Sequence, residues 1–167
     1  MEENTNINKG ALIMNGRAKF VMKKWAGAAF GLTVITGNHM SILGKHLKMI
    51  TDVEKDELDT FHEYDKDVIV GEDVWLAANV TLLSGVNIGR GCIVGSGSVI
   101  RVSTPPYSIV IGNPAKVVGF VFTPEEIIEH EKRLYPQSER LPLELLQKNY
   151  DKFFVKKIKE INIFLKL

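Results

Sequence analysis

Four histidines are the side chains best suited to accept a proton near neutral pH, because imidazole titrates close to pH 7. His39 stands where an ordered repeat stops and a long charged loop begins. His46 and His62 lie within that loop, where each could be structural, exposed or acceptor-binding. His130 lies among charged residues in a predicted helix, and we expect its side chain to be solvated. A lone histidine is more often structural than catalytic, so the elements around His39 must decide its role.

Other common reactive sites find little support in the sequence. There is no P-loop and no GxGxxG opening a helix after a strand, and Gly95-Ser96-Gly97 is a corner of a repeat and not a phosphate cradle. The serines of the repeat have no nearby histidine and acid that would favour a covalent acyl intermediate. Cys92 is the only cysteine, so no disulfide is possible within the chain, and a single buried thiol fits a reducing compartment.

A repeat of six residues runs through residues 70–103. The first position of every block is aliphatic, the second is mostly small, and the fifth is small or β-branched. The first positions are Val70, Leu76, Leu82, Ile88, Val94 and Ile100. This period fits neither a helix face nor a simple alternating strand, and it is typical of hexapeptide-repeat parallel β-helices. An ordinary sandwich with fortuitous spacing is the alternative.

In such a fold each block forms one short strand and one corner, and three blocks complete one coil. The spacing predicts that Val70 lies below Ile88, Leu76 below Val94, and Leu82 below Ile100, with strands ~4.8 Å apart. The aliphatic side chains would form ladders inside the prism, and the corners require small residues.

A weaker period of six precedes this stretch, with the first positions occupied by Met14, Phe20, Ala26 and Leu32. It predicts one or two imperfect coils, although a plain β-meander is an alternative. We expect residues 1–11, which are polar, to be frayed. Residues 40–67 carry many charges and no repeat, and a long loop of this kind inside a compact domain is usually functional. The alternative is a mobile surface insertion without a role.

The sequence after the repeat changes character. Pro105-Pro106-Tyr107 interrupts strand pairing, and residues 108–118 predict a partial coil. Thr123, Pro124 and Glu126 predict a helix start with a capping box, and the helix should run to Tyr135. A second helix is expected from about residue 142 to 161, and these helices should close the open end of the β-helix. The predicted domains are therefore a β-helix domain (1–122, with loop 40–67 inserted) and a helical extension (123–167).

Length and composition set the remaining limits. The chain has 167 residues, a formal net charge of +1 and 25% charged residues, which suits one domain and gives no global attraction to nucleic acid or anionic membrane. No signal peptide and no run of apolar residues long enough to span a membrane is visible, so the expected location is the cytoplasm.

The repeat, together with GEDVWLAANV, GSGSVI, PPYSIVIGNPAKVV and the upstream Asn-His, resembles the hexapeptide-repeat acyltransferases. The resemblance is good from about Leu32 to Gly119 and looser to Leu141. It is strongest to the group that includes maltose, galactoside and nodulation acetyltransferases and capsular polysaccharide O-acetyltransferases. The resemblance implies a mainly β fold, a left-handed parallel β-helix, with a projecting loop and C-terminal helices. It also implies acetyl-CoA as co-substrate and a homotrimer in which the loop covers a neighbouring subunit's active site.

The resemblance also implies roles for individual residues. His39 matches the family's catalytic histidine and would be the general base. The expected acetyl-CoA-binding residues are Trp75, Ala78, Ser96, Gly97, Arg101 and Lys116. Trp75 would line the groove beside the pantetheine arm, with packing against a neighbouring chain as the alternative. Arg101-Val102 stands where the family often has Thr-Lys, and Leu76-Ala77 where it commonly has Ile-Gly. The first departure leaves the phosphate contacts open.

The predicted function is an acetyl-CoA-dependent O-acetyltransferase acting on a hydroxyl of a sugar or polysaccharide, by direct transfer in a ternary complex. N-acetylation of an amino sugar or another small acceptor is an alternative, as is a non-catalytic β-helix scaffold for assembly. A zinc hydratase on the same architecture would need three histidine ligands, which the spacing here does not provide. We therefore expect no metal. From the charge balance and the lack of a long apolar run, we expect no nucleic-acid partner and no membrane insertion.

Overall fold

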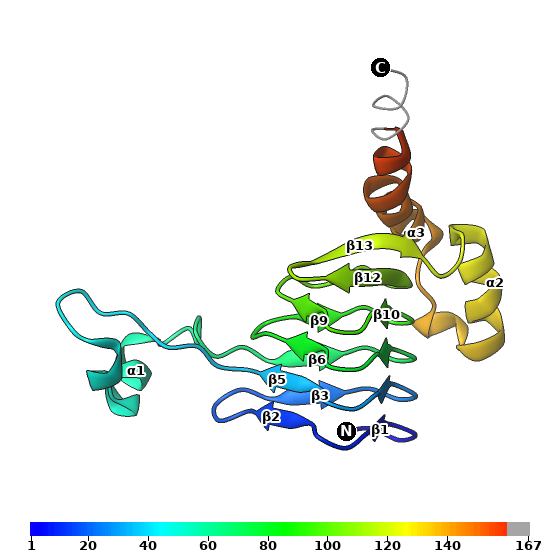
Figure 1. Ribbon diagram of the computed structural model, residues 1–167. Coiled ribbons are helices and arrows are strands. Elements are labelled where there is room, and N and C mark those ends of the chain that lie inside the picture. Colours follow the sequence, from blue (N-terminus) through cyan, green and yellow to red (C-terminus); the bar gives the residue numbers. More distant parts are fainter. Residues whose placement is uncertain (160–167) are drawn as a thin grey trace.

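The computed structural model describes residues 1–159 and shows a parallel β-helix, a three-sided prism of stacked coils (Figure 1). Each of the first three coils contributes one short strand to each of three sheets. The first sheet contains β1 (Asn6–Ile7), β4 (Gly27–Ala28), β7 (Trp75–Leu76), β10 (Ile93–Val94), β12 (Ser108–Gly112) and β13 (Ala115–Phe120), in that order. The second contains β11 (Val99–Ile100), β8 (Thr81–Leu82), β5 (Thr33–Ile35) and β2 (Leu12–Met14). The third contains β3 (Phe20–Met22), β6 (Val68–Val70) and β9 (Asn87–Ile88).

The predicted stacking of the strong repeat is confirmed residue by residue. The strand register pairs Val70 with Ile88, Leu76 with Val94, and Leu82 with Ile100. All six side chains are buried in one continuous core. Burial of an aliphatic side chain of this size contributes roughly 1.5–3 kcal/mol, so the ladders supply much of the stability of the prism.

The repeat frame predicted for the earlier coils is wrong by two residues. The inward first positions are Met22, Ala28 and Val34, which pair with Val70, Leu76 and Leu82 and are fully buried. The two predicted first positions that are buried, at residues 26 and 32, occupy fifth positions instead. In this segment apolar residues occupy both the first and the fifth positions of the repeat. The sequence therefore shows the period of six but not which apolar residue is the first of each block.

The expectation of a frayed amino terminus is also wrong. β1 pairs with β4 and β2 pairs with β5, so residues 1–14 form the lowest part of the prism. The Glu2 amide donates to the Met22 carbonyl at 2.9 Å. The edge of the coil above offers a row of backbone partners, and those hydrogen bonds order a segment whose side chains are mostly exposed.

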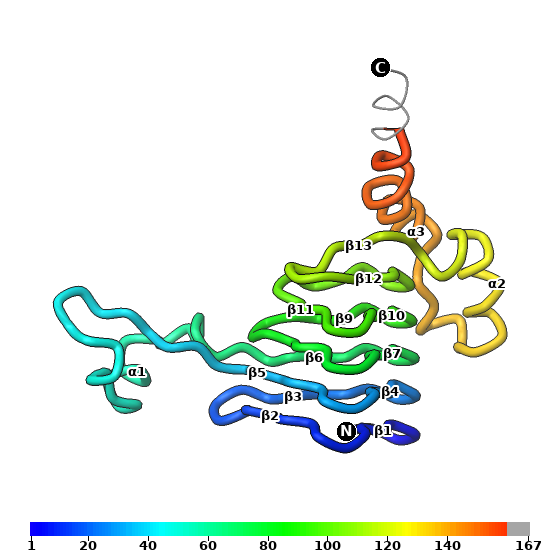
Figure 2. The backbone as a smooth tube through the Cα atoms, in the orientation of Figure 1, coloured from blue at the N-terminus to red at the C-terminus, as the bar shows by residue number. Residues whose placement is uncertain are grey.

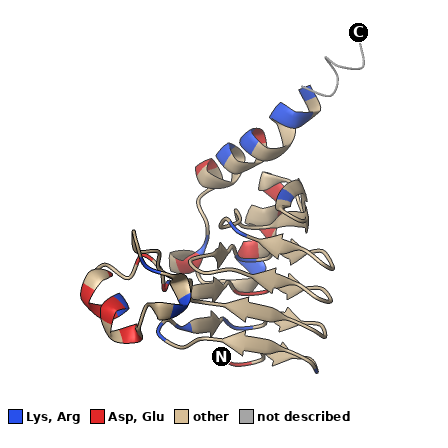
Figure 3. Cartoon of the chain, turned by 60° about the vertical axis from the view of Figure 1, so that its left-hand side comes forward, with Lys and Arg blue, Asp and Glu red and all other residues tan. Residues whose placement is uncertain are grey.

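Residues 40–67 project from the prism as an arm (Figure 2). The arm contains the 3-10 turn η1 (Leu47–Met49) and the helix α1 (Asp52–Leu58), which the sequence analysis did not predict. The helix begins with a capping box, in which Thr51 and Glu54 each bond the other's backbone amide. In Figure 3, acidic and basic residues are gathered on this arm.

After the strong repeat, the structure differs from the prediction in its last strands and agrees with it in helix α2. β12 continues the first sheet, but the chain then folds back as the antiparallel strand β13, so the predicted partial coil is a hairpin. Helix α2 (Pro124–Leu134) has the predicted capping box at Thr123 and ends before Tyr135 as predicted. It is followed by the 3-10 turn η2 (Gln137–Glu139).

The second predicted helix is found as α3 (Leu143–Tyr150), a π-helical turn η3 (Asp151–Val155) and helical residues 156–159; residues 160–161 of the prediction lie outside the described part of the chain. Phe153 packs against the core, so this helix covers the last strand, as expected, whereas α2 lies beside the prism (Figure 1).

The structure tests the expected environments of two further side chains, Cys92 and His130. Cys92 is fully buried as predicted, and burial raises the pKa of its thiol. His130 is half-buried between the rings of Tyr107 and Phe122, so it is packed and not solvated. Among residues 1–159, no helix combines the length and the apolar character needed to cross a membrane. Within the same residues, no three His, Cys, Asp or Glu side chains are grouped in a way that could hold a metal ion.

Candidate active site

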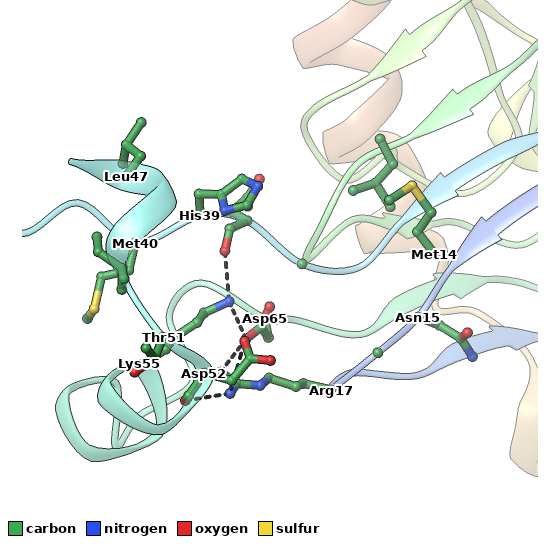
Figure 4. Close-up of a pocket in the computed structure, with 15 residues that line it drawn as sticks. Met14, Asn15, Arg17, His39, Met40, Leu47, Thr51, Asp52, Lys55 and Asp65 are labelled. Carbon is green, nitrogen blue, oxygen red and sulfur yellow. Dashed lines mark hydrogen bonds and ion pairs between the residues drawn. The ribbon is translucent and has the colours of Figure 1, made fainter.

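His39 lies at a pocket of ≈ 420 Å³ between the prism and the base of the arm (Figure 4). Its side chain is exposed, as access to a substrate requires. The wall is part apolar and part polar and comes from coil 1, from the end of β5 and from the arm. The lining residues are Met14, Asn15, Gly16, Arg17, Ile35, Gly37, Asn38, His39, Met40, Leu47, Ile50, Thr51, Asp52, Lys55 and Asp65.

The segment that carries His39 is fixed by the returning end of the arm. The Asn38 amide donates to the Tyr64 carbonyl at 2.8 Å, and the Lys66 amide donates to the Thr36 carbonyl at 3.0 Å. Between these bonds, Gly37 and Asp65 form an antiparallel bridge. The two ends of the arm therefore leave and re-enter the prism side by side, and His39 is placed at the point of exit.

The charged side chains of the pocket are paired with one another. Lys55 Nζ lies 2.6 Å from Asp65 Oδ2, and Arg17 Nη1 lies 3.7 Å from the same oxygen. Arg17 also approaches Asp56 at 3.1 Å and Asp52 at 3.6 Å. Both cations of the pocket wall are therefore already neutralised by carboxylates of the arm.

Trp75, the first of the predicted acetyl-CoA residues, lies in β7 with its indole on the outer face of the first sheet. Its side chain remains 46% exposed, and it lies against Gly27 of the coil below, where a Cβ would come within 3.1 Å of the ring. A flat apolar surface with an indole donor is thus presented to solvent, as the prediction requires.

Ala78, Ser96 and Gly97 are brought together at one corner of the prism, between the first and second sheets. The Gly97 amide donates to the Ala78 carbonyl at 2.9 Å, so the two corners are stacked directly. Lys116 is exposed in β13, and the Gly112 amide of the same hairpin donates to Ser98 Oγ at 3.1 Å. The hairpin that carries Lys116 therefore lies above this corner.

Arg101 lies elsewhere. It follows β11 at the end of the second sheet, one coil above Leu83, whose amide donates to the Ile100 carbonyl at 3.1 Å. The same corner of the prism carries Ser84, next to Leu83, and Thr36, three residues before His39. Ser84 Oγ donates to the Thr36 carbonyl at 2.8 Å. Arg101 is exposed there, on the side of His39 and away from the other predicted acetyl-CoA residues.

In one chain the predicted site residues thus form two groups, one at the first sheet with Trp75 and one on the side of His39. None of the residues predicted to bind acetyl-CoA lines the pocket of His39. The first sheet, which carries Trp75, is the face opposite the edge from which the arm leaves. The assigned roles of these residues remain predictions.

Sequence reasoning gave no role to Arg17, Lys55 and Asp65, which share the pocket with His39. Their segments are distant in the chain, and no local pattern links them. Asn15 also lines the pocket.

Comparisons with known proteins agree with the repeat and the fold. Residues 67–101 match the family model described as bacterial transferase hexapeptide (six repeats). The chain is 35% identical over 121 residues to a probable macrolide acetyltransferase of Lysinibacillus sphaericus, a match that covers 72% of this chain and 62% of the relative. It is 47% identical over 71 residues to WbbJ, a putative lipopolysaccharide biosynthesis O-acetyl transferase of Escherichia coli K12, covering 42% and 33% of the two chains.

Among solved structures, a variant of AntD, an N-acyltransferase from Bacillus cereus in complex with dTDP and coenzyme A, superposes with a TM-score of 0.58. That match covers 77% of this chain and 66% of AntD at 19% identity, which is a likeness of fold alone. The chain spans 62% and 33% of the lengths of the two curated relatives. The six-residue repeat at residues 67–101 and the prism of parallel strands therefore show that this chain resembles the hexapeptide-repeat acyltransferases.

Proposed function

We propose that this protein transfers an acetyl group from acetyl-CoA to a hydroxyl group of a sugar or polysaccharide, with His39 as general base. The observation that carries the proposal is the exposed imidazole of His39 at the mouth of a pocket, between a hexapeptide-repeat prism and its projecting arm. Two curated relatives that bear acetyltransferase names, and the fold shared with an AntD variant that holds coenzyme A, support it.

In the proposed reaction the unprotonated imidazole of His39 accepts the proton of the acceptor hydroxyl. The hydroxyl oxygen attacks the thioester carbonyl, a C–O bond forms, and the tetrahedral intermediate collapses with loss of the C–S bond. The imidazolium then returns its proton to the sulfur of CoA. A base of this kind contributes typically 10²- to 10⁴-fold to the rate.

Direct transfer is favoured over a covalent acyl-enzyme. Cys92 is enclosed in the core and the raised pKa of its thiol disfavours the thiolate that would be the nucleophile. Ser84 Oγ, which lies close to the His39 segment, is committed to the Thr36 carbonyl and the Lys66 amide. Neither side chain is available for acylation, so both substrates would bind together.

Acetyl-CoA is proposed to bind along the outer face of the prism. Trp75 would pack beside the pantetheine arm, and backbone groups at Ala78, Ser96 and Gly97 would bond its amides. Lys116 would approach the phosphates as an exposed cation of the same chain, and Arg101, which lies on the side of His39, as an exposed cation of the neighbouring copy. The face of Trp75 and the edge of His39 point away from each other in one chain, so a homotrimer that joins the face of one copy to the edge of the next would complete the site.

The acceptor class rests on narrower support. WbbJ carries the name of an O-acetyl transferase of lipopolysaccharide biosynthesis, which favours a sugar hydroxyl. The pocket wall adds side-chain amide and hydroxyl groups from Asn15, Asn38 and Thr51, which suit hydrogen bonding to a polyol.

The decisive experiment measures free-thiol release from acetyl-CoA with a panel of sugars, amino sugars and small alcohols. His39→Ala should lower turnover by at least a hundredfold and leave the thermal midpoint unchanged. His46→Ala is the matched control, because His46 lies in the same arm, makes no side-chain cap bond and does not line the pocket.

Retention of more than a tenth of wild-type turnover by His39→Ala would remove the assignment. A protein that is not thermally stabilised by CoA, and that releases no thiol with any acceptor, would instead support a scaffold role, since a ligand that binds the native state raises its stability.

A further inference from the structure

The peptide unit that joins Asn38 to His39 is held by a lysine from the arm. Lys55, in α1, donates from Nζ to the Asn38 carbonyl oxygen at 2.7 Å. The peptide group is planar, so a bond that fixes this oxygen also fixes the plane that contains the nitrogen and Cα of His39. The Lys55 side chain is only 12% exposed, so water competes little for its ammonium group.

Lys55 is in turn held by Asp65. The carboxylate lies 2.6 Å from Nζ, and its side chain is only 6% exposed. Gly37 makes this approach possible, since a Cβ at that position would lie 2.5 Å from Asp65 Oδ1. Arg17 of coil 1 lies on the same carboxylate, so Asp65 is shared between the prism and the arm. Figure 4 shows Lys55 reaching between the His39 segment and Asp65.

From this geometry we infer that Lys55, oriented by Asp65, is a positioning residue that sets the direction of the His39 imidazole. The inference rests on the proposed function for its catalytic consequence. Lys55 itself takes no part in proton transfer, because its ammonium is engaged by the Asn38 carbonyl and the Asp65 carboxylate. Because Lys55 belongs to α1, a shift of this helix would also change the orientation of the His39 imidazole.

A misplacement of a catalytic group by about 1 Å can cost on the order of 10² in rate. Lys55→Met keeps the length and the apolar stem of the side chain and removes the ammonium. It should lower kcat about ten- to a hundredfold and change KM for acetyl-CoA less than about twofold, because the Lys55 ammonium is engaged by the Asn38 carbonyl and the Asp65 carboxylate and does not hold a substrate.

The matched control is Lys45→Met. Lys45 forms an ion pair with Glu54 in the same arm, yet it neither contacts the His39 segment nor lines the pocket. This variant should keep wild-type kcat. The same two substitutions are then made in the His39→Ala background, where Lys55→Met should have no further effect on the residual rate, because the base that it positions is gone.

An equal loss of rate from Lys55→Met in both backgrounds would overturn the inference and make Lys55 a residue of fold stability only. A kcat for Lys55→Met as high as that of Lys45→Met would overturn it as well. A readout independent of turnover is the backbone amide NMR signal of His39, which should move in Lys55→Met and stay in place in Lys45→Met. If the wild type proves inactive, the proposed function fails, and an unmoved His39 signal would still refute the positioning role on its own.

Discussion

Arg90 of the prism and Glu131 of α2 form an ion pair at 3.2 Å, and the Glu131 side chain is fully buried. The Tyr107 hydroxyl and the Leu141 amide also donate to this carboxylate, at 3.1 and 2.5 Å. Arg90 in addition pairs with Glu72 at 2.8 Å. Helix α2 is therefore fastened to the side of the prism by a buried polar network and not by apolar contact alone.

Glu131→Ala should destabilise the protein by about 3–5 kcal/mol, because the Tyr107 hydroxyl and the Leu141 amide lose their buried acceptor and Arg90 keeps only Glu72 as a partner. Glu129→Ala on the same helix is the matched control, since Glu129 forms an exposed pair with Lys132 and its loss should change the free energy of unfolding far less. Urea unfolding of both variants measures the difference. Equal midpoints would show that the network does not anchor the helix.

Gly97 allows a test of the acetyl-CoA corner that spares the fold. Its φ of 68° is left-handed, and Asn79 takes the equivalent position one coil below with φ 58°. Asparagine tolerates this conformation, so Gly97→Asn should cost well under 1 kcal/mol, whereas Gly97→Val should cost roughly 1–2 kcal/mol.

Both side chains would project from the corner and should weaken CoA binding at least tenfold, measured by calorimetry. Unaltered CoA affinity in Gly97→Asn would remove this corner from the proposed groove.

Trp75 and Trp25 are the two tryptophans of the chain, and both are exposed, at 46% and 63%. If CoA lies against Trp75, titration with CoA should change the fluorescence of the wild type and of Trp25→Phe. The change should be absent in Trp75→Phe, because only Trp25 then remains. A CoA-dependent change that survives in Trp75→Phe and disappears in Trp25→Phe would place the cofactor at the other tryptophan.

Alkaline pH should weaken the attachment of α2. Burial raises the pKa of Tyr135 from 10.0 to about 12, and burial and the Glu131 carboxylate raise the pKa of Tyr107. As pH rises, the unfolded chain therefore loses its phenolic protons before the folded chain does. The stability that these two tyrosines contribute is complete below pH 10 and falls as pH rises toward 12.

Urea midpoints between pH 9 and pH 12 measure the decline, and Tyr135→Phe should make it shallower. A profile for Tyr135→Phe as steep as that of the wild type would assign the loss to other groups.

The parts of the fold that depend on neighbouring residues were predictable from the chain alone. A period of six sets which residues stack at a separation of 18, so the pairing of Val70 with Ile88 follows from local pattern once the β-helix is inferred. The start of α2 at Thr123 was predicted for the same reason, because a capping box is complete within four residues. The phase of the first coils was not predictable, since Ala26 and Leu32 satisfy an apolar slot in either frame.

The amino-acid sequence by itself therefore determined the prism, its core ladders and the candidacy of His39, because each depends on short-range order repeated along the chain. Only the tertiary structure decided what surrounds that histidine. Arg17, Lys55 and Asp65 come from coil 1, from α1 and from the returning end of the arm, and they meet at one carboxylate. No spacing rule connects them, because their contact depends on where an irregular arm folds back, and that is set by the packing and charge pairing of the whole chain.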